Sequence, residues 1–326
     1  MSKPLVSVII PTYNYAHYIS QAIDSILQQT YPTDSIEIIV YDDGSTDNTD
    51  EVVKKYADRL SIKYFFQQNK GKASATYNAI LASSGKYIFN LDADDYFCPQ
   101  KIEASVIIFE LNEDIVHVSS PARIVYTHKD SDDVERIPAE LIERPLDGKL
   151  LSLYFFKNHI LYGGGSTYGA RASVLKQIEI PDCVDMYIDE FLLLAIFSLG
   201  KSFFIKEPLS IWRVHKFNYS GNSQTLDEKV KKMNRLMASS EGVLSYLIVH
   251  KFDKHIIDIY RLHNLTRKIS FKEEQGIKSF KDVLGYASEV FFKIRPSWSL
   301  IRNYYVLNRL IPTSLLKSLK GVLNIK

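Results

Sequence analysis

The sequence predicts an α/β fold, a mostly parallel sheet with helices on both faces, followed by a helical extension. Four apolar, strand-like runs alternate with amphipathic helical stretches in the first third of the chain, which favours right-handed β-α-β units. The charge composition then changes. Residues 1–222 hold 21 Lys and Arg against 29 Asp and Glu, whereas residues 223–326 hold 19 against 9. We therefore expect a catalytic domain over residues 1–222 and a basic helical region over residues 223–326.

Strand-like runs occupy residues 5–10, 36–41, 63–66 and 86–91, and the first, second and fourth read as buried strands. Helical patterns follow them, at 19–27, from about 46, up to about 82, and from Pro99. Further strands are expected at 115–119, 123–126, near Phe203 and at 211–214, with a helix over 189–199. The acidic segment from Asp130 to Glu135 is expected to be a solvated turn.

Composition limits the class of protein. The 326 residues are 46% hydrophobic and 24% charged, typical of a folded soluble domain and not of a disordered chain. Two cysteines, Cys98 and Cys183, provide neither a disulfide framework nor a zinc site, which favours a reducing compartment. The apolar runs are shorter than the ~18 residues of a membrane-spanning helix, and the N-terminus lacks a signal-peptide pattern. A cytoplasmic location is expected, either free or peripheral on the inner face of the cell membrane.

Carboxylates gather where two of the predicted strands end. Asp42 and Asp43 follow the second strand, and Asp92, Asp94 and Asp95 follow the fourth. Because ligands of parallel sheets bind beyond the carboxyl ends of the strands, these side chains are expected to converge. Carboxylates this close resist ionisation unless a cation neutralises them, and Mg²⁺ or Mn²⁺ prefers such oxygen ligands. Helix capping and turn formation are the alternative for the same aspartates.

Several motifs occur in a fixed order over residues 4–222. They are Val8 to Asn14 (Val-Ile-Ile-Pro-Thr-Tyr-Asn), Ser25 to Pro32, Ile38 to Asp47, Asn69 to Gly71, Asn78, Gly85 to Asp95, Asp189-Glu190, and Trp212 to His215. In order and spacing the chain resembles family 2 of the nucleotide-sugar glycosyltransferases. The resemblance implies the GT-A fold, Mn²⁺ or Mg²⁺ as cofactor, and inverting transfer of a hexose or N-acetylhexosamine from a nucleotide-sugar donor.

The resemblance also implies roles for individual residues. Those expected at the nucleotide sugar are Pro11, Thr12, Tyr13, Asn14, Asp42, Asn69, Lys72, Asp92, Ala93 and Arg213. Asp42 matches the carboxylate that accepts the uracil imide hydrogen, which favours a UDP-sugar because a base without that hydrogen leaves the charge unpaired. Asp43 is expected to organise the turn. Asp94 would bind the metal, with Asp95 and His215 as further ligands, although a lone histidine is also commonly a core residue.

The general base is expected in the acidic pair Asp189-Glu190, because an attacking hydroxyl must lose its proton to a nearby carboxylate. The family order is reversed here, and the second position implies Glu190, with Asp189 as the alternate; a capping role for Asp189 also fits. Gly163 to Ser166 matches a turn near the acceptor pocket, or is a plain loop. For Trp212, packing is favoured over stacking on the substrate.

The C-terminal region ends in a basic tail. Seven Lys and Arg follow Glu289 with no further acidic residue, and Leu315, Leu316, Leu319, Val322 and Leu323 share one face of a helical pattern. Such a segment fits an interfacial helix on an anionic membrane. Packing of its apolar face on the catalytic domain or on a second subunit, in a homodimer, is the alternative.

The sequence thus predicts transfer of a sugar to a glycan or lipid-linked hydroxyl, in surface polysaccharide synthesis of the bacterial type. The alternatives are an inactive relative that serves as a nucleotide-sugar-binding scaffold, and a nucleotidyltransferase. The latter requires a Gly-rich, Arg-containing loop after the first strand, where this chain has Pro11 to Asn14. A nucleic-acid partner is disfavoured by the acidic charge of residues 1–222.

Overall fold

The computed structural model describes residues 3–57, 59, 61–129, 131–158, 162–216, 218, 225–277 and 280–292. The chain divides into two compact units. The first comprises Met1–Ser152 and Leu161–Thr225, and the second comprises Leu153–Ile160 and Leu226–Lys326. The division after Thr225 lies three residues beyond the boundary expected from charge.

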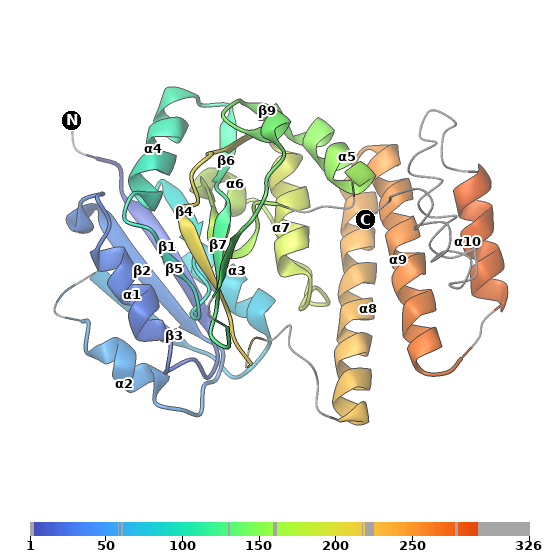
Figure 1. The fold of residues 1–326 in the computed structure, drawn as a ribbon, viewed down its shortest axis with the longest axis horizontal. Coiled ribbons are helices and arrows are strands. Elements are labelled where there is room, and N and C mark those ends of the chain that lie inside the picture. The colour runs from blue at the N-terminus through green and yellow to red at the C-terminus, as the bar shows by residue number, and fades with distance from the viewer. Residues whose placement is uncertain are drawn as a thin grey trace. The chain divides into compact units, whose positions relative to one another are not determined.

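An eight-stranded sheet forms the centre of the first unit (Figure 1). Its order is β3-β2-β1-β4-β10-β6-β11-β9. The strands are β1 (Val6–Thr12), β2 (Ile36–Asp42), β3 (Ser61–Phe66), β4 (Tyr87–Asn90), β6 (Ile115–Ser119), β9 (Leu146–Asp147), β10 (Tyr168–Arg171) and β11 (Lys201–Phe204). β1 pairs in parallel with both β2 and β4, and β2 with β3. The predicted α/β class with a mostly parallel sheet is confirmed.

The central strands are apolar because both of their faces are covered. β1 is buried along its whole length, and Val8 and Ile10 belong to one core cluster with residues of α1 (Ile19–Leu27) and α4 (Lys101–Leu111). Side chains alternate along a strand, so Ile9 faces the opposite side, where α3 (Lys72–Ala82) packs against β1 and β2. The other described α-helices that begin in the first unit are α2 (Thr49–Lys54), α5 (Gly148–Asn158), α6 (Ala172–Leu175) and α7 (Ile188–Phe197).

β10 was not expected from the sequence. It runs antiparallel between β4 and β6, with Gly169 opposite Phe89 and Val118. Its four residues, Tyr-Gly-Ala-Arg, are too short and too mixed to show a strand pattern. The strand has a functional consequence, because it follows directly on the Gly163–Thr167 segment and fixes that segment beside the end of β4.

A second sheet has the order β5-β12-β7-β8. Its strands are β5 (Tyr96–Phe97), β7 (Ala122–Tyr126), β8 (Asp132–Val134) and β12 (Ser210–Val214). β12 pairs with β5 in antiparallel fashion through Ser210 and Ile211, directly after the Asp92–Asp95 turn. This pairing carries the Trp212–His215 segment to the aspartates.

The second unit contains the helices α8 (Leu226–Val249), α9 (Lys254–Glu274) and α10 (Phe280–Phe292). Its core combines Ile259, Leu262, Tyr286 and Val290, with Phe156 from the end of α5 packed against them. Among the described helices, none has both the length and the hydropathy to cross a membrane. The expected apolar stripe from Leu315 to Leu323 lies outside the described residues.

Candidate active site

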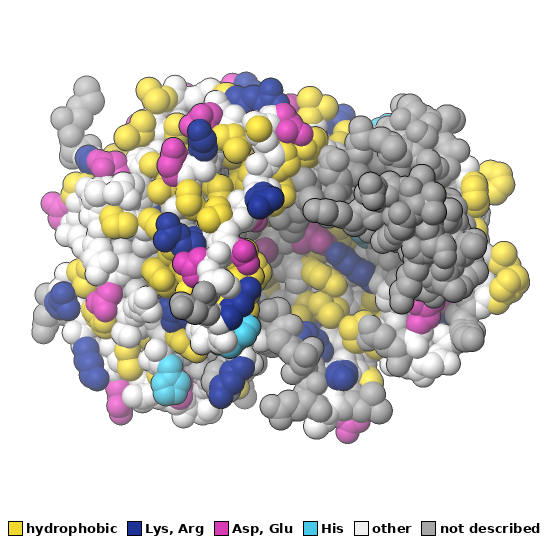
Figure 2. Space-filling view, in the orientation of Figure 1, with side chains coloured by type: hydrophobic (Ala, Val, Ile, Leu, Met, Phe, Trp, Pro, Cys, Tyr) yellow, Lys and Arg dark blue, Asp and Glu magenta, His cyan; other side chains and the backbone are white. Residues whose placement is uncertain are grey.

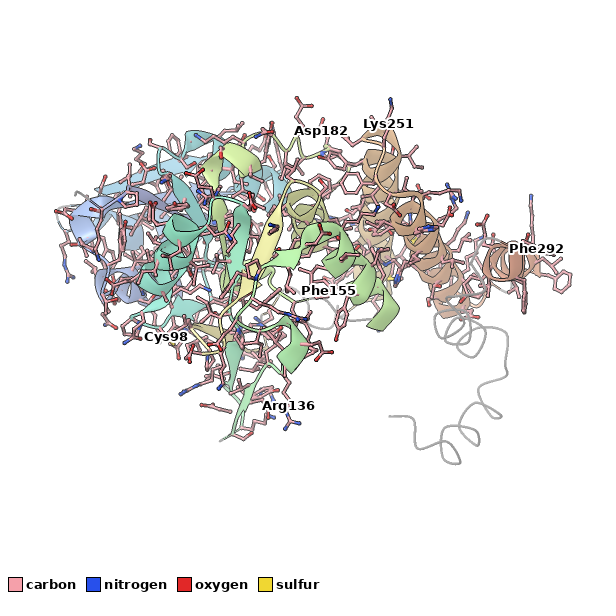
Figure 3. The ribbon with its side chains drawn as sticks, turned by 90° about the horizontal axis from the view of Figure 1, so that it is seen from above. Cys98, Arg136, Phe155, Asp182, Lys251 and Phe292 are labelled. Carbon is pink, nitrogen blue, oxygen red and sulfur yellow. The ribbon has the colours of Figure 1, made fainter. Side chains whose placement is uncertain are left out.

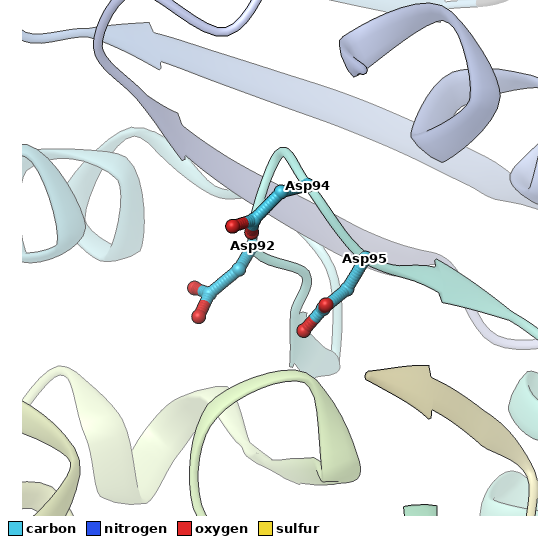
Figure 4. Close-up of side chains that lie close together, drawn as sticks. All are labelled: Asp92, Asp94 and Asp95. Atoms are coloured by element: carbon cyan, nitrogen blue, oxygen red, sulfur yellow. The ribbon is translucent and has the colours of Figure 1, made fainter. Parts of the chain in front are cut away.

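Three aspartates meet at the turn that follows β4 (Figure 4). The N–H of Leu91 still donates to the carbonyl of Ile9 on β1, after which the N–H of Asp95 donates to the carbonyl of Asp92 and closes a tight turn. One carboxylate oxygen each from Asp92, Asp94 and Asp95 lies within 4.8 Å of the others. The three carboxylates that follow β4 therefore lie together as expected, whereas Asp42 lines a separate pocket at the end of β2, so the expected convergence of the two groups is not shown.

The electrostatics of this cluster favour a cation. Burial, together with the charges of Asp94 and Asp92, raises the pKa of Asp95 well above its usual range. Burial and the charge of Asp92 also raise the pKa of Asp94. A divalent ion would relieve both penalties, and the donor set of carboxylate oxygens fits Mg²⁺ or Mn²⁺.

Asp94 is surrounded by groups from two distant segments. His215 Nε2 lies 3.1 Å from Asp94 Oδ2, and Asn218 Nδ2 donates to the same oxygen at 3.0 Å. Two ligands at ~2.1 Å from an octahedral ion are themselves about 3 Å apart, so His215 and Asp94 have the spacing of neighbouring ligands. The Tyr15 hydroxyl also hydrogen-bonds Asp94, and burial together with that charge raises the pKa of Tyr15. Sequence reasoning missed Tyr15 and Asn218, although both lie next to quoted motifs.

Ser166 holds the turn in place. Its hydroxyl donates to Asp95 Oδ2 at 2.6 Å and accepts from the Asp92 N–H at 3.0 Å. The other oxygen of Asp95 accepts from the backbone N–H of Arg213 at 2.9 Å. The Arg213 side chain does not point to the aspartates; it bonds Gln21 and lies over the ring of Tyr18.

Lys72 links this cluster to the acidic pair of α7. Its Nζ donates to Asp92 Oδ2 at 2.8 Å and lies 3.7 Å from Asp189 Oδ2. Burial alone would lower the pKa of Lys72, but the charges of Asp189 and Asp92 outweigh it and raise that pKa. Burial raises the pKa of Asp189, while the positive charge of Lys72 opposes that rise and favours the carboxylate.

A pocket of about 280 Å³ opens between these groups. It is lined by Asp92, Asp95, Asp189, the Gly163–Thr167 segment, Ala122, Glu135, Ser210 and Trp212. Asp189 is among the lining residues, and its neighbour Glu190 is not. Gly164 packs so closely on α7 that an added Cβ would lie 3.1 Å from the Cβ of Asp189.

Two residues of this pocket differ from their sequence expectations. Trp212 was assigned to packing, but 46% of it is exposed and it lines the pocket. Glu135 was placed in a solvated turn, yet it also lines the pocket. The turn is the β7–β8 hairpin, and the pairing of Arg123 with Val134 brings Glu135 back to Ala122.

A second pocket, of about 380 Å³, lies at the end of β2. It is lined by Asp42, Ser45, Asp47, Asp50, Tyr64 and Phe66. Asp42 is almost fully buried and accepts from the Tyr64 hydroxyl at 2.6 Å and from the Ser45 N–H at 2.7 Å. Asp43 accepts from the N–H groups of Lys70 and Gly71, so it ties this turn to the loop after β3, while the hydrogen bond within the turn itself goes to Asp42.

The remaining predicted residues surround the β1 end. Pro11 and Thr12 are buried at the end of β1, and Ala93 is buried in the aspartate turn. Tyr13 and Asn69 are exposed. Asn14 instead joins two loops, since its N–H donates to Ser45 Oγ and its side-chain oxygen accepts from the Thr46 N–H.

Known proteins are similar to this chain in sequence. The model of glycosyl transferase family 2 matches residues 7–177. An uncharacterized glycosyltransferase of Nostoc sp. is 29% identical over 249 residues, 74% of this chain and 76% of that protein. The chondroitin synthase of Pasteurella multocida is 44% identical over 101 residues, 31% of this chain but only 10% of the synthase.

Solved structures show the same fold. Residues 1–349 of S. aureus TarS, in complex with UDP-GlcNAc, align with a TM-score of 0.61 at 18% identity, over 94% of this chain and 81% of that one. The mannosyltransferase PcManGT of Pyrobaculum calidifontis, in complex with GDP-Man and Mn²⁺, aligns at 0.52 with 16% identity, over 100% and 89%. The motifs, the fold and a family match over more than half of the sequence agree, and the chain belongs to the glycosyltransferases of family 2.

Proposed function

We propose that this protein transfers a sugar, with inversion, from a UDP-sugar to a hydroxyl of a glycan or lipid-linked acceptor, in a reaction that depends on Mn²⁺ or Mg²⁺. The observation that carries the proposal is the pocket that Asp92 and Asp95, on either side of Asp94 in the aspartate turn, line together with Asp189. A group that holds a diphosphate through a cation and a group that can accept a proton thus face the same space.

The pocket at Asp42 supports a UDP donor. A buried carboxylate there can accept the imide hydrogen of uracil, and the aromatic rings of Tyr64 and Phe66 line the same space. TarS, which has the same fold, has been solved with UDP-GlcNAc. The Pasteurella synthases, which match 31% of this chain, support a polysaccharide product.

Asp94, Asp95 and His215 would hold the divalent ion, which when bound supplies Lewis-acid stabilisation of the diphosphate leaving group. Asp189 takes the proton of the acceptor hydroxyl as its oxygen attacks the anomeric carbon. The bond from that carbon to the diphosphate breaks on the opposite side, and one displacement inverts the configuration. Lys72 favours the ionised form of Asp189 and so keeps it able to accept the proton.

The proposal for the acceptor includes attachment of the protein to a membrane. The basic region 223–326 would bind an anionic leaflet and bring the pocket to lipid-linked acceptors.

Release of the nucleotide diphosphate from a panel of nucleotide sugars, with Mn²⁺ and with or without acceptors, tests the proposal. UDP-sugars are expected to turn over, and Asp94→Asn to abolish both turnover and the Mn²⁺-dependent binding of UDP measured by calorimetry. The exposed carboxylate Glu113 provides the control, because Glu113→Gln should change neither. UDP binding without turnover of any donor would instead indicate a scaffold.

A further inference from the structure

The pocket beside the aspartates has a second wall that the proposed chemistry does not use. One wall carries Asp92, Asp95, Asp189 and the Gly163–Thr167 segment. The other comes from the β5-β12-β7-β8 sheet and carries Trp212 and Glu135, with Ala122 and Ser210 between them. A volume of about 280 Å³ is at the small end for ligand pockets, which suits a single sugar ring better than an oligosaccharide.

Trp212 presents an aromatic surface to this pocket. Along β12 its neighbours Ile211 and Arg213 are only 6% and 7% exposed, whereas Trp212 is 46% exposed. Strand alternation therefore turns Trp212 away from the core and toward the open space. A large apolar surface left uncovered inside a pocket commonly marks the place where a ligand packs, and the C–H face of a pyranose is a flat apolar surface of matching size.

Glu135 is held so that its carboxylate faces the same space. Its N–H donates to the carbonyl of Ala122 at 2.9 Å, and its Oε2 accepts from the Ala122 N–H at 3.2 Å. The flanking Val134 and Arg136 are exposed, and Arg136 extends away from the ribbon (Figure 3). The hairpin thus turns one acidic side chain inward between two outward-facing neighbours.

Every charged side chain among the described lining residues is negative: Asp92, Asp95, Asp189 and Glu135. Lys72 offsets two of these charges, because its Nζ lies 2.8 Å from Asp92 Oδ2 and 3.7 Å from Asp189 Oδ2. The other cation close to the pocket, Lys101, is fully buried and bonds Ser120 and Thr167. A metal held by the strand-end aspartates would offset their charges, whereas the described hydrogen bonds of Glu135 join it only to the backbone of Ala122. An anion brought against Glu135 would therefore meet repulsion that the buried Lys101 only partly offsets.

We propose that Trp212 and Glu135 form a subsite for a neutral pyranose, whose C–H face packs on Trp212 and whose hydroxyls donate to Glu135, and that Glu135 rejects sugars that carry a carboxylate. This inference rests on the proposed function and narrows its substrate class. The ring belongs either to the donor or to the acceptor, and the two sources share this chemistry.

Trp212 itself reports on the subsite. The chain has two tryptophans, Trp212 and Trp298, so Trp298→Phe leaves Trp212 as the single tryptophan, which can be excited selectively over the tyrosines at long wavelength. In one arm this full-length variant, with Mn²⁺ and UDP, is titrated with methyl glucoside, methyl N-acetylglucosaminide and methyl glucuronide. In the other arm it is titrated with Mn²⁺ and UDP-glucose, UDP-GlcNAc or UDP-glucuronic acid.

In at least one of the two titrations, the neutral sugars are expected to change the Trp212 emission. They should also bind at least about tenfold more tightly than the corresponding glucuronic acid compound. The responding arm assigns the ring to acceptor or donor. In the Trp298→Phe background, Glu135→Gln should reduce the preference for neutral sugars to about twofold or less. The control substitution Glu113→Gln in the same background should leave this preference unchanged.

No emission change with any neutral sugar, or an undiminished preference in Glu135→Gln, would overturn the inference. Binding of UDP and Mn²⁺ is measured by calorimetry on the same samples. If UDP binds while the sugars give no response, only the subsite is refuted; if UDP does not bind, the proposed function fails as well.

Discussion

Lys101 is a lysine with no exposed surface, placed under the segment that lines the pocket. Its Nζ donates to Ser120 Oγ at 3.0 Å and to the carbonyl of Thr167, which also accepts from Ser119 Oγ at 2.9 Å. Burial lowers the pKa of Lys101 to about 7. The lysine therefore fixes the Gly163–Thr167 segment by hydrogen bonds at the cost of holding a poorly solvated charge.

This lowered pKa predicts a pH-dependent stability. Between about pH 7 and 10 the unfolded chain binds a proton at Lys101 that the folded protein lacks, so stability should rise with pH by up to ~1.4 kcal/mol per unit. Lys101→Met should remove this rise. Urea denaturation from pH 7.5 to 9.5 measures it, with the exposed Lys55→Met as control. Parallel curves for Lys101→Met and wild type would show that Lys101 titrates normally.

The identity of the general base is also a single-residue question. Asp189 lines the pocket and faces Lys72, so we expect Asp189→Asn to reduce sugar transfer by ~10²–10⁴-fold while UDP and Mn²⁺ still bind. Glu190→Gln, a matched neutral substitution one residue away, should retain most of the activity. If the two variants behave the other way round, the base is Glu190, as the family order implies.

Among the elements, the Gly163–Thr167 segment depends most on its backbone. Gly163 has φ +91° and Gly165 has φ +55°, in the left-handed region that other residues rarely adopt. An added Cβ at Gly163 would lie 2.9 Å from His117 Cε1, whereas at Gly165 the nearest atom, Asp92 Oδ2, is 3.8 Å away. Both positions carry the backbone penalty, but only Gly163 carries the clash.

Alanine substitutions separate these two effects. Gly165→Ala is expected to lower the free energy of unfolding by ~1–2 kcal/mol, the cost of the left-handed conformation. Gly163→Ala should cost at least ~1 kcal/mol more, because His117 is buried and cannot move aside freely. Denaturant unfolding of the two variants compares them directly, and equal losses would mean that the loop relaxes around the new methyl group.

At the scale of the whole molecule, charge is distributed unevenly along the chain. Residues 223–326 carry 19 Lys and Arg against 9 Asp and Glu, and the last 34 residues carry seven basic residues and no acidic one. On the visible face of the first unit, acidic and basic side chains are interspersed (Figure 2). Under the proposed membrane attachment, we therefore expect an anionic surface to bind through the C-terminal region.

Removal of residues 293–326 should weaken sedimentation with phosphatidylglycerol liposomes at least tenfold, since each basic residue near such a surface contributes ~1 kcal/mol. Added salt should weaken binding of the full chain in the same direction. Phosphatidylcholine liposomes serve as the neutral control. Equal binding by the full and shortened chains would favour packing of the tail within the protein or against a second subunit.

The sequence by itself determined the alternation of strands and helices over about the first 110 residues and the aspartates at the strand ends. Buried parallel strands must be apolar along their length, so β1, β2 and β4 are visible as runs, and the polar residues that follow them must lie at one edge of the sheet. The motifs around Asp42 and Asp92 are likewise local in sequence. These features needed no knowledge of distant contacts.

Only the tertiary structure decided how distant segments meet. The insertion of β10 between β4 and β6, the approach of Lys72 to Asp189, and the return of Glu135 to Ala122 each join residues that are tens of positions apart or lie across a hairpin. A side chain's partner in such cases depends on strand pairing and helix packing, which periodicity does not encode. The same reason applies to Trp212, whose large apolar side chain is typical of a core residue. Its place at the pocket follows only from the pairing of β12 with β5 and β7.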